Sequence, residues 1–167
     1  MMKRLIYILL LASIIAGCKK SEYILDYSGI EPIVIVPNSN WPGKSMYDPQ
    51  PADTTYGVTQ LKLYARISYA TPLDKDLKVT FVEDKEALTL YNSKWGTNYQ
   101  ELPEDAFTVS SLELTIPAGQ KQGFIPVTIF PDKFNGLDDY LIAYKISEAG
   151  IPVASNARTI VFTLKGQ

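Results

Sequence analysis

The side chains that could do chemistry in this sequence are carboxylates and aromatic rings, because its 167 residues include no histidine and one cysteine, Cys18. Without histidine, imidazole-based acid–base catalysis and a typical zinc site are excluded. Neighbouring carboxylates could still form a glycosidase pair, and the acidic pairs are Glu83 and Asp84, Glu104 and Asp105, and Asp138 and Asp139. Each falls at a predicted strand end or turn, where carboxylates are solvated, and no spacing selects two of them. We therefore expect no catalytic residue and no enzyme.

Calcium is the metal that oxygen-rich loops could bind, and two such stretches occur, Asp74-Lys75-Asp76 and Asp138-Asp139. Each could supply two or three ligands, whereas calcium takes about six to eight oxygens, and no EF-hand-like spacing is present. We expect no metal site and no cofactor apart from covalent lipid.

Aromatic rings offer flat apolar area that can stack on a sugar or a peptide. Trp41 lies in the polar segment NSNWPGKSMY, with Tyr47 and Tyr56 close in sequence. These three residues are the candidate ligand contacts. Two interpretations of Trp41 stay open, since a tryptophan in such a loop can also fold back onto its own domain.

The residues before the cysteine, Ile15, Ala16 and Gly17, resemble the bacterial lipobox. This resemblance implies diacylglycerol on the Cys18 sulfur, cleavage before Cys18, and an acyl chain such as palmitate on the new amino group. An incidental cysteine near an ordinary cleavage site is the alternative. Two or three acyl chains hold a protein on a bilayer much more firmly than one, so we expect permanent anchoring.

The N-terminal residues have the order of a signal peptide: Lys3 and Arg4, an uncharged apolar run over residues 5–16, and then a small residue. The run is shorter than the roughly 20 residues that cross a bilayer as a helix. The sequence therefore predicts a cleaved signal peptide over 1–17, a lipidated tether over 18–30 and one domain over 31–167. Cleavage removes two of the 16 basic residues and leaves 14 against 18 acidic ones, a balance that argues against nucleic-acid binding.

Period-two alternation dominates the chain after residue 56 and predicts half-buried strands. In the segment 58–70, Leu61, Leu63, Ala65 and Ile67 share one face, and Lys62, Tyr64, Arg66 and Ser68 share the other. The same alternation recurs around residues 79–81, 112–116, 125–129, 142–146 and 160–164, and the run 33–36 suits a short edge strand between prolines. Six or seven strands result.

One segment, residues 84–96, instead has Leu88, Tyr91 and Trp95 at helical spacing and a glycine at its end. Many strands with one short crossover helix predict an all-β, antiparallel, immunoglobulin-like β-sandwich of about seven strands. Gly96 and Gly119 suit positive backbone φ, and Pro103 suits a turn. We expect Tyr91 and Trp95 to fill one end of the sandwich, with a sugar-stacking role as the alternative.

Three stretches have a familiar order: YNSKWGTNYQELP at 91–103, TIPAGQKQG at 115–123 and DYLIAYKIS at 139–147. They resemble a Bacteroidetes lipoprotein family catalogued as domain of unknown function 1735, over roughly residues 31–165. The motif residues that we interpret as structural are Tyr91, Asn92, Trp95, Gly96, Tyr99, Leu102, Pro103 and Gly119. The family has no catalytic residues to transfer.

The resemblance implies an immunoglobulin-like sandwich, often placed between a lipid anchor and a carbohydrate-active or carbohydrate-binding domain. Here we expect no further domain after the sandwich. The predicted function is therefore a non-catalytic cell-envelope lipoprotein, a binding or accessory subunit of an outer-membrane glycan or oligopeptide uptake system. Its partners would be a glycan, other outer-membrane lipoproteins or a starch-utilisation-type transporter pair. The alternative is a structural or adhesion module that pairs strands with another protein.

The predicted location is the outer membrane, lipid-anchored and exposed at the cell surface, with the periplasmic face as the alternative. Surface-exported lipoproteins of Bacteroidetes often carry an acidic run after the cysteine, whereas this chain has Lys19 and Lys20. That departure weighs against surface exposure.

Overall fold

The computed structural model describes residues 29–42 and 54–166, and the chain from Glu31 to Gln167 forms one compact unit. Cys18, the residues of the lipobox and Tyr47 lie outside the described residues. No helix in the described ranges is both long and apolar enough to cross a membrane.

Four antiparallel strands form the first sheet, in the order β1 (Ile33–Ile35), β3 (Gln60–Ser68), β8 (Gln122–Ile129) and β6 (Phe107–Val109). The alternation in β3 works as predicted, since its apolar positions are buried and its polar positions face solvent. Cross-strand pairing of β3 with β8 places Leu61 opposite Val127 and Leu63 opposite Ile125. Apolar side chains of both strands therefore enter the same interior.

The second sheet has six strands. Its main order is β2 (Thr55–Tyr56), β10 (Thr159–Lys165), β9 (Asp139–Ala149), β4 (Leu77–Glu83) and β7 (Glu113–Ile116), and β5 (Gln100–Glu101) also pairs with β9. The β2–β10 and β5–β9 pairs are parallel and the others antiparallel. Two short 3₁₀ helices, Glu104–Ala106 and Pro131–Lys133, lie beside β6 and after β8.

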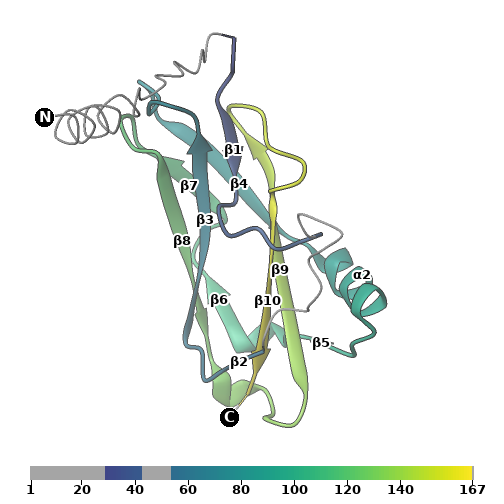
Figure 1. Cartoon of the computed structure of the whole chain (residues 1–167). Coiled ribbons are helices and arrows are strands. Elements are labelled where there is room, and N and C mark those ends of the chain that lie inside the picture. Colours follow the sequence, from purple (N-terminus) through teal and green to yellow (C-terminus); the bar gives the residue numbers. More distant parts are fainter. Residues whose placement is uncertain (1–28, 43–53, 167) are drawn as a thin grey trace, which may run out of the picture. The chain divides into compact units, whose positions relative to one another are not determined.

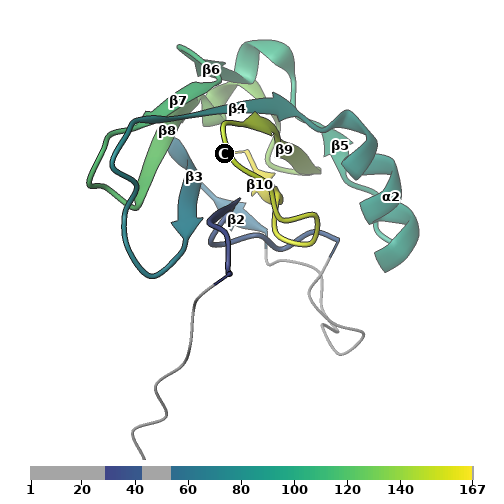
Figure 2. The same cartoon turned by 90° about the horizontal axis from the view of Figure 1, so that it is seen from above.

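The two sheets pack face to face around the main core (Figures 1 and 2). Fully buried side chains come from both sheets, and the largest are Tyr144, Phe81, Leu63, Ile67, Ile116 and Ile129. This confirms the predicted all-β sandwich. The three strands that the alternation does not predict, β2, β5 and β6, have only two or three residues, too few for a period to be visible.

The helix α2 (Lys85–Trp95) was predicted almost to the residue, and it ends at Gly96 with φ 64°. It packs on the outer face of the six-stranded sheet (Figure 1). A second apolar cluster forms there from Trp41, Ala87, Tyr91, Tyr99, Leu141, Ala143 and Val161. This explains why β9 is apolar on both faces. Tyr91 and Trp95, both on this helix, therefore pack toward the outer face of the sheet. Their expected place at one end of the sandwich was wrong.

The N-terminal segment closes one side of the sandwich. β1 pairs with β3, and the Val34 N–H donates to the Pro152 carbonyl at 2.9 Å on its other edge. Further along, the Asn40 amide accepts from the Val161 N–H and donates to the Val161 carbonyl, both at 2.8 Å. The Ser39 hydroxyl also donates to the Thr159 carbonyl at 2.7 Å, and Trp41 forms a β-bridge with Thr159, so segment 39–41 covers this part of the β10 edge.

Candidate functional site

Asn92 organises the turn after α2 and explains much of the sequence motif around it. Its Oδ1 accepts from the Tyr99 N–H and the Thr97 hydroxyl, each at 2.9 Å, and its Nδ2 donates to the Tyr99 carbonyl at 2.9 Å. Gly96 supplies the positive φ that starts this turn. The predicted structural role of the motif thus has a physical basis: Asn92 holds the loop that leads from the helix into β5.

The other motif residues also occupy structural positions. Leu102 is buried in the main core, and Pro103 precedes the first 3₁₀ helix. Gly119 has φ 78° in the turn between β7 and β8, where the Asp76 carboxylate accepts from the Ala118 N–H at 2.8 Å. Asp76, considered above as a calcium ligand, therefore caps a turn.

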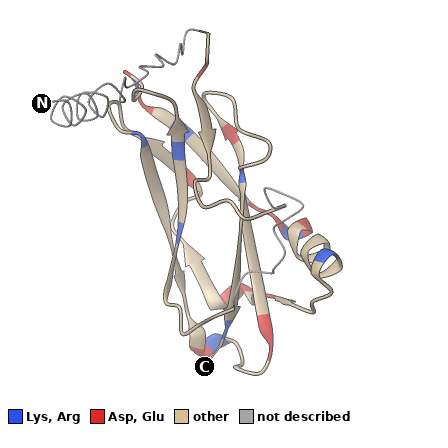
Figure 3. Ribbon diagram, viewed as in Figure 1, with Lys and Arg blue, Asp and Glu red and all other residues tan. Residues whose placement is uncertain are grey.

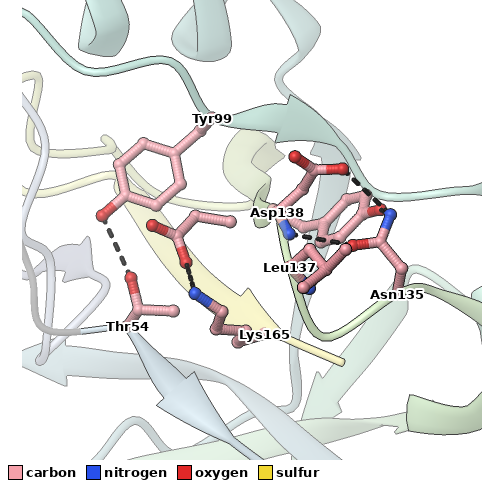
Figure 4. Close-up of polar contacts among 8 residues, drawn as sticks. Thr54, Tyr99, Asn135, Leu137, Asp138 and Lys165 are labelled. Carbon is pink, nitrogen blue, oxygen red and sulfur yellow. Dashed lines mark hydrogen bonds and ion pairs between the residues drawn. The ribbon is translucent and has the colours of Figure 1, made fainter. Parts of the chain in front are cut away.

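A polar pocket of about 350 Å³ lies beside the Asn92 turn, lined by Thr97, Asn98, Tyr99, Leu137, Asp138 and Asp139. Figure 4 shows how its groups are held. The Asn135 Oδ1 accepts from the N–H groups of Leu137 and Asp138, each at 2.8 Å. The rim carries Leu137, whose side chain is 90% exposed.

Four of the polar side chains that line this pocket are already engaged within the protein, those of Thr97, Tyr99, Asp138 and Asp139. Asp138 accepts from the Asn135 Nδ2 at 2.9 Å, and Asp139 pairs with Lys165 at 3.3 Å. The Tyr99 hydroxyl shares a 3.2 Å hydrogen bond with Thr54 (Figure 4). A ligand would have to compete with these contacts, so the pocket is a weaker candidate than its size suggests. Among the described residues no three or more Asp, Glu or Cys side chains are grouped so that they could hold a metal ion.

Trp41 is 8% exposed and packs on Tyr91, with ring centroids 5.4 Å apart. The Lys94 ammonium lies 5.2 Å from the Trp41 ring and 4.5 Å from the Trp95 ring, and it donates to the Pro42 carbonyl at 2.6 Å. From this position Trp41 offers little ring surface to a ligand. Its folded-back position matches the second interpretation of the sequence, while its contact with a ligand stays a prediction.

Tyr56, the other candidate contact among the described residues, is 68% exposed on the short edge strand β2. The Lys165 ammonium lies 5.8 Å from its ring centroid. Tyr56 and Trp41 therefore do not share a cluster: Trp41 is packed under the helix, and Tyr56 stands in solvent.

Among the acidic residues in the described ranges, Glu83 has a carboxyl whose pKa is shifted upward. Burial raises the pKa of the Glu83 carboxyl, Lys85 lowers it, and Glu101 and Glu104 raise it. The cavity beside Glu83 measures about 10 Å³, room for about one water molecule. A glycosidase site must hold a sugar between its carboxylates, and this space is far too small for one.

The outer face of the four-stranded sheet carries an aromatic pair, one half-buried and one exposed ring, that the sequence pattern did not predict. Tyr64 on β3 lies opposite Phe124 on β8, with ring centroids 5.4 Å apart and planes tilted by 50°. Phe124 is 45% exposed. The Lys62 ammonium lies 4.9 Å from the Phe124 ring centroid. We call these three residues, together with Arg66 on the same strand face, the outer-face platform.

The aromatic pair of the platform allows two interpretations, a structural one and a ligand-binding one. Cross-strand aromatic pairs stabilise a sheet by roughly 0.2–1 kcal/mol even without a ligand. An exposed ring flanked by polar side chains is also the arrangement that stacks on a sugar. A signal for it was present in the sequence, because Tyr64 falls on the polar face of an amphipathic strand. Composition alone gave no reason to prefer it over the tryptophan in the polar loop.

Comparison with known proteins agrees with the fold. A family model described as an N-terminal domain matches residues 37–153. A Bacteroides ovatus protein provisionally described as carbohydrate-binding has 15% identity and a TM-score of 0.60, over 81% of this chain and 37% of that chain. A Bacteroides ovatus multidomain protein including DUF1735 has 18% identity and a TM-score of 0.55, over 81% and 44%.

A third solved structure is EndoBT-3987 of Bacteroides thetaiotaomicron with a Man5GlcNAc product. It has 17% identity and a TM-score of 0.50, over 65% of this chain and 27% of that chain. At these identities the likeness shows a shared fold. This chain spans less than half the length of each of the three proteins. No curated protein matches the sequence.

Proposed function

Because the chain belongs to the family of N-terminal domains of the type called domain of unknown function 1735, we propose that it is a non-catalytic glycan-binding lipoprotein. In this proposal lipid on Cys18 holds it on the outer membrane, and it serves as an accessory subunit of a glycan-uptake system. A starch-utilisation-type transporter pair would be its partner. The description of one structural relative as carbohydrate-binding and the sugar product held by another support the glycan as ligand.

The observation that carries the proposal is the outer-face platform. Its strands expose polar side chains at the other outward positions of β3 and β8, such as Gln60, Gln122 and Thr128. Rings on such a face offer apolar area for sugar faces, while the amides and hydroxyls can hydrogen-bond sugar hydroxyl groups. The platform is open along the sheet, so it suits a chain of sugars better than a single one.

Glycan binding can be tested with the full-length protein purified in detergent. We expect retention by at least one polysaccharide in affinity gel electrophoresis and a measurable Kd by calorimetry. The double variant Tyr64→Ala with Phe124→Ala should lose this binding. The matched control is Phe130→Ala, which removes another exposed ring, outside the platform.

Two results would contradict the proposal. One is that no polysaccharide in a broad panel is retained. The other is that the double variant, shown to be folded by its thermal unfolding, binds as the wild-type protein does. The accessory role has a separate test, because purification of the tagged protein from its own membranes should recover a transporter pair of outer-membrane proteins.

A further inference from the structure

The two sheets of this protein differ sharply in charge. None of the four strands of the first sheet contains an aspartate or a glutamate. Strands of the second sheet contain five: Glu83, Glu101, Glu113, Asp139 and Glu148. Figure 3 shows basic residues along β3 and no acidic residue on β3 or β8. In a chain of net charge −2, the first sheet is thus locally positive.

The positive charges flank the aromatic pair. Lys62, Tyr64 and Arg66 follow one another on the outward side of β3, and Phe124 lies opposite Tyr64. Lys62 and Arg66 are four positions apart along the strand, a distance of about 13 Å between their backbones. The two rings lie between the two cations, along the direction of the strand.

The described part of the chain offers these two cations no carboxylate partner. Its ion pairs join Lys85 to Glu101, Lys145 to Asp84, and Lys165 to Asp139. Lys62 instead lies over the Phe124 ring, a contact that leaves an ammonium group able to bind an anion. Positive charge is therefore available at both ends of the rings.

We propose that the outer-face platform binds an acidic polysaccharide, a chain of sugars that carries uronate carboxylates. This inference rests on the proposed function and names its substrate class. The rings of Tyr64 and Phe124 stack on sugar faces, Arg66 binds one carboxylate in the two-pronged geometry of guanidinium, and Lys62 binds another as a point charge. A neutral glycan would leave both cations without a partner.

The test compares polygalacturonate with the same polymer fully methyl-esterified, which keeps the sugars and removes the charge. The full-length wild-type protein in detergent should bind the acidic polymer more tightly, and added salt should weaken this binding. Lys62→Gln and Arg66→Gln should each weaken it by about tenfold. Alginate and hyaluronan, two other uronate chains, extend the acidic panel.

The matched control is Lys78→Gln with Lys133→Gln, which removes two exposed cations that lie outside the first sheet. It should leave the affinity for the acidic polymers unchanged. The charge variants lie on the surface and keep the rings, so they test the inference even where an aromatic variant fails to fold.

The possible outcomes separate this inference from the proposed function. Equal binding of neutral and acidic polymers, lost only with the rings, would overturn the acidic ligand and leave glycan binding in place. Binding of no glycan at all would overturn both. Binding of polyglutamate as tightly as polygalacturonate would overturn the inference too, because the platform would then be a docking surface for acidic protein.

Discussion

Asn92 is the residue on which the loop after the helix depends most. Its side chain makes three hydrogen bonds to that loop, two of them to the backbone of Tyr99. Asn92→Ala would leave the partly buried N–H and carbonyl of Tyr99 without this partner. We expect the free energy of unfolding to fall by about 2–4 kcal/mol, measured by urea denaturation.

Two further variants make that measurement specific. Asn92→Asp keeps the acceptor oxygen and loses the donor to the Tyr99 carbonyl, so its loss should be smaller. Gln100→Ala removes an exposed side chain that donates only to the nearby Asn98 carbonyl at 3.2 Å, and it should change stability by less than about 0.5 kcal/mol. Equal stability of Asn92→Ala and Gln100→Ala would show that the loop does not need the clamp.

Ionisation of Glu83 is expected to lower the free energy of unfolding as pH rises. Burial raises its pKa above the usual 4.5, so the folded protein holds this proton more tightly than the unfolded chain does. The resulting stability is fully present below pH 4.5 and is lost as pH rises through the folded pKa. Glu83→Gln never ionises, so it should melt at a higher temperature than the wild-type protein at about pH 8.

Thermal unfolding at about pH 4 and about pH 8 checks this expectation. The advantage of Glu83→Gln should be present at the higher pH and small at the lower one. Glu113→Gln removes the same charge from an exposed position on β7 and serves as the control. A variant that melts below the wild-type protein at pH 8 would mean that the attraction of Lys85 outweighs the effect of burial.

Single residues also show where inference from sequence stops. The positive φ at Gly96 and Gly119 was foreseen, because a turn after a helix or strand needs it. Trp41 was selected because its neighbours are polar, but its ring is covered by Tyr91 and Lys94, contacts between segments about 50 residues apart in sequence. Tyr64 and Phe124 form a pair only through the register of two strands, which one-dimensional alternation does not define.

At the scale of elements, the edges of the sheets decide whether strand addition is available. β1 is bonded on its second edge to the loop 152–157, and Asn40 covers Val161 on the edge of β10. The edge strands β6 and β7 have three and four residues. Short or covered edges disfavour pairing with another chain, so the described structure favours binding through a sheet face over adhesion through an edge.

Asn40→Ala tests the protection of that edge. It removes both hydrogen bonds to Val161, and we expect stability to fall by about 2 kcal/mol and the exposed backbone to promote self-association. Sedimentation of the protein lacking residues 1–18 should show a monomer for wild type and larger species for the variant. Asn38→Ala, at an exposed position two residues away, should stay monomeric, and assemblies in the wild-type protein would instead favour the adhesion hypothesis.

The elements themselves were largely predictable, for a physical reason. β3, β8 and α2 each face solvent on one side and the interior on the other, so their periods are visible in the sequence. The sequence of β9 did not show that both of its faces are covered, because Leu141 and Ala143, on its outward face, are buried under the helix as well. Because this packing was not predicted, Tyr91 and Trp95 were expected at the end of the sandwich, whereas they lie on its outer face.

At the scale of the whole molecule, the sandwich spans less than half of three longer proteins that share its fold. In the proposal, the lipid at the start of the chain and the open sheet face have separate roles. The lipid keeps the protein at the membrane, and the face binds a polymer that passes by. Neither task needs a reactive group.

The anchor is testable apart from the ligand. Each methylene buried in a bilayer contributes about 0.8 kcal/mol, so two or three acyl chains make release negligible. Cys18→Ala removes the sulfur that would carry the lipid, and we expect this variant to lose labelling by radioactive palmitate and to leave the membrane fraction. Ser21→Ala, three residues further on, should keep both properties. If the Cys18→Ala variant stayed in membranes as before, attachment would have to come from another part of the chain, and the platform would no longer be held at the surface in the way proposed.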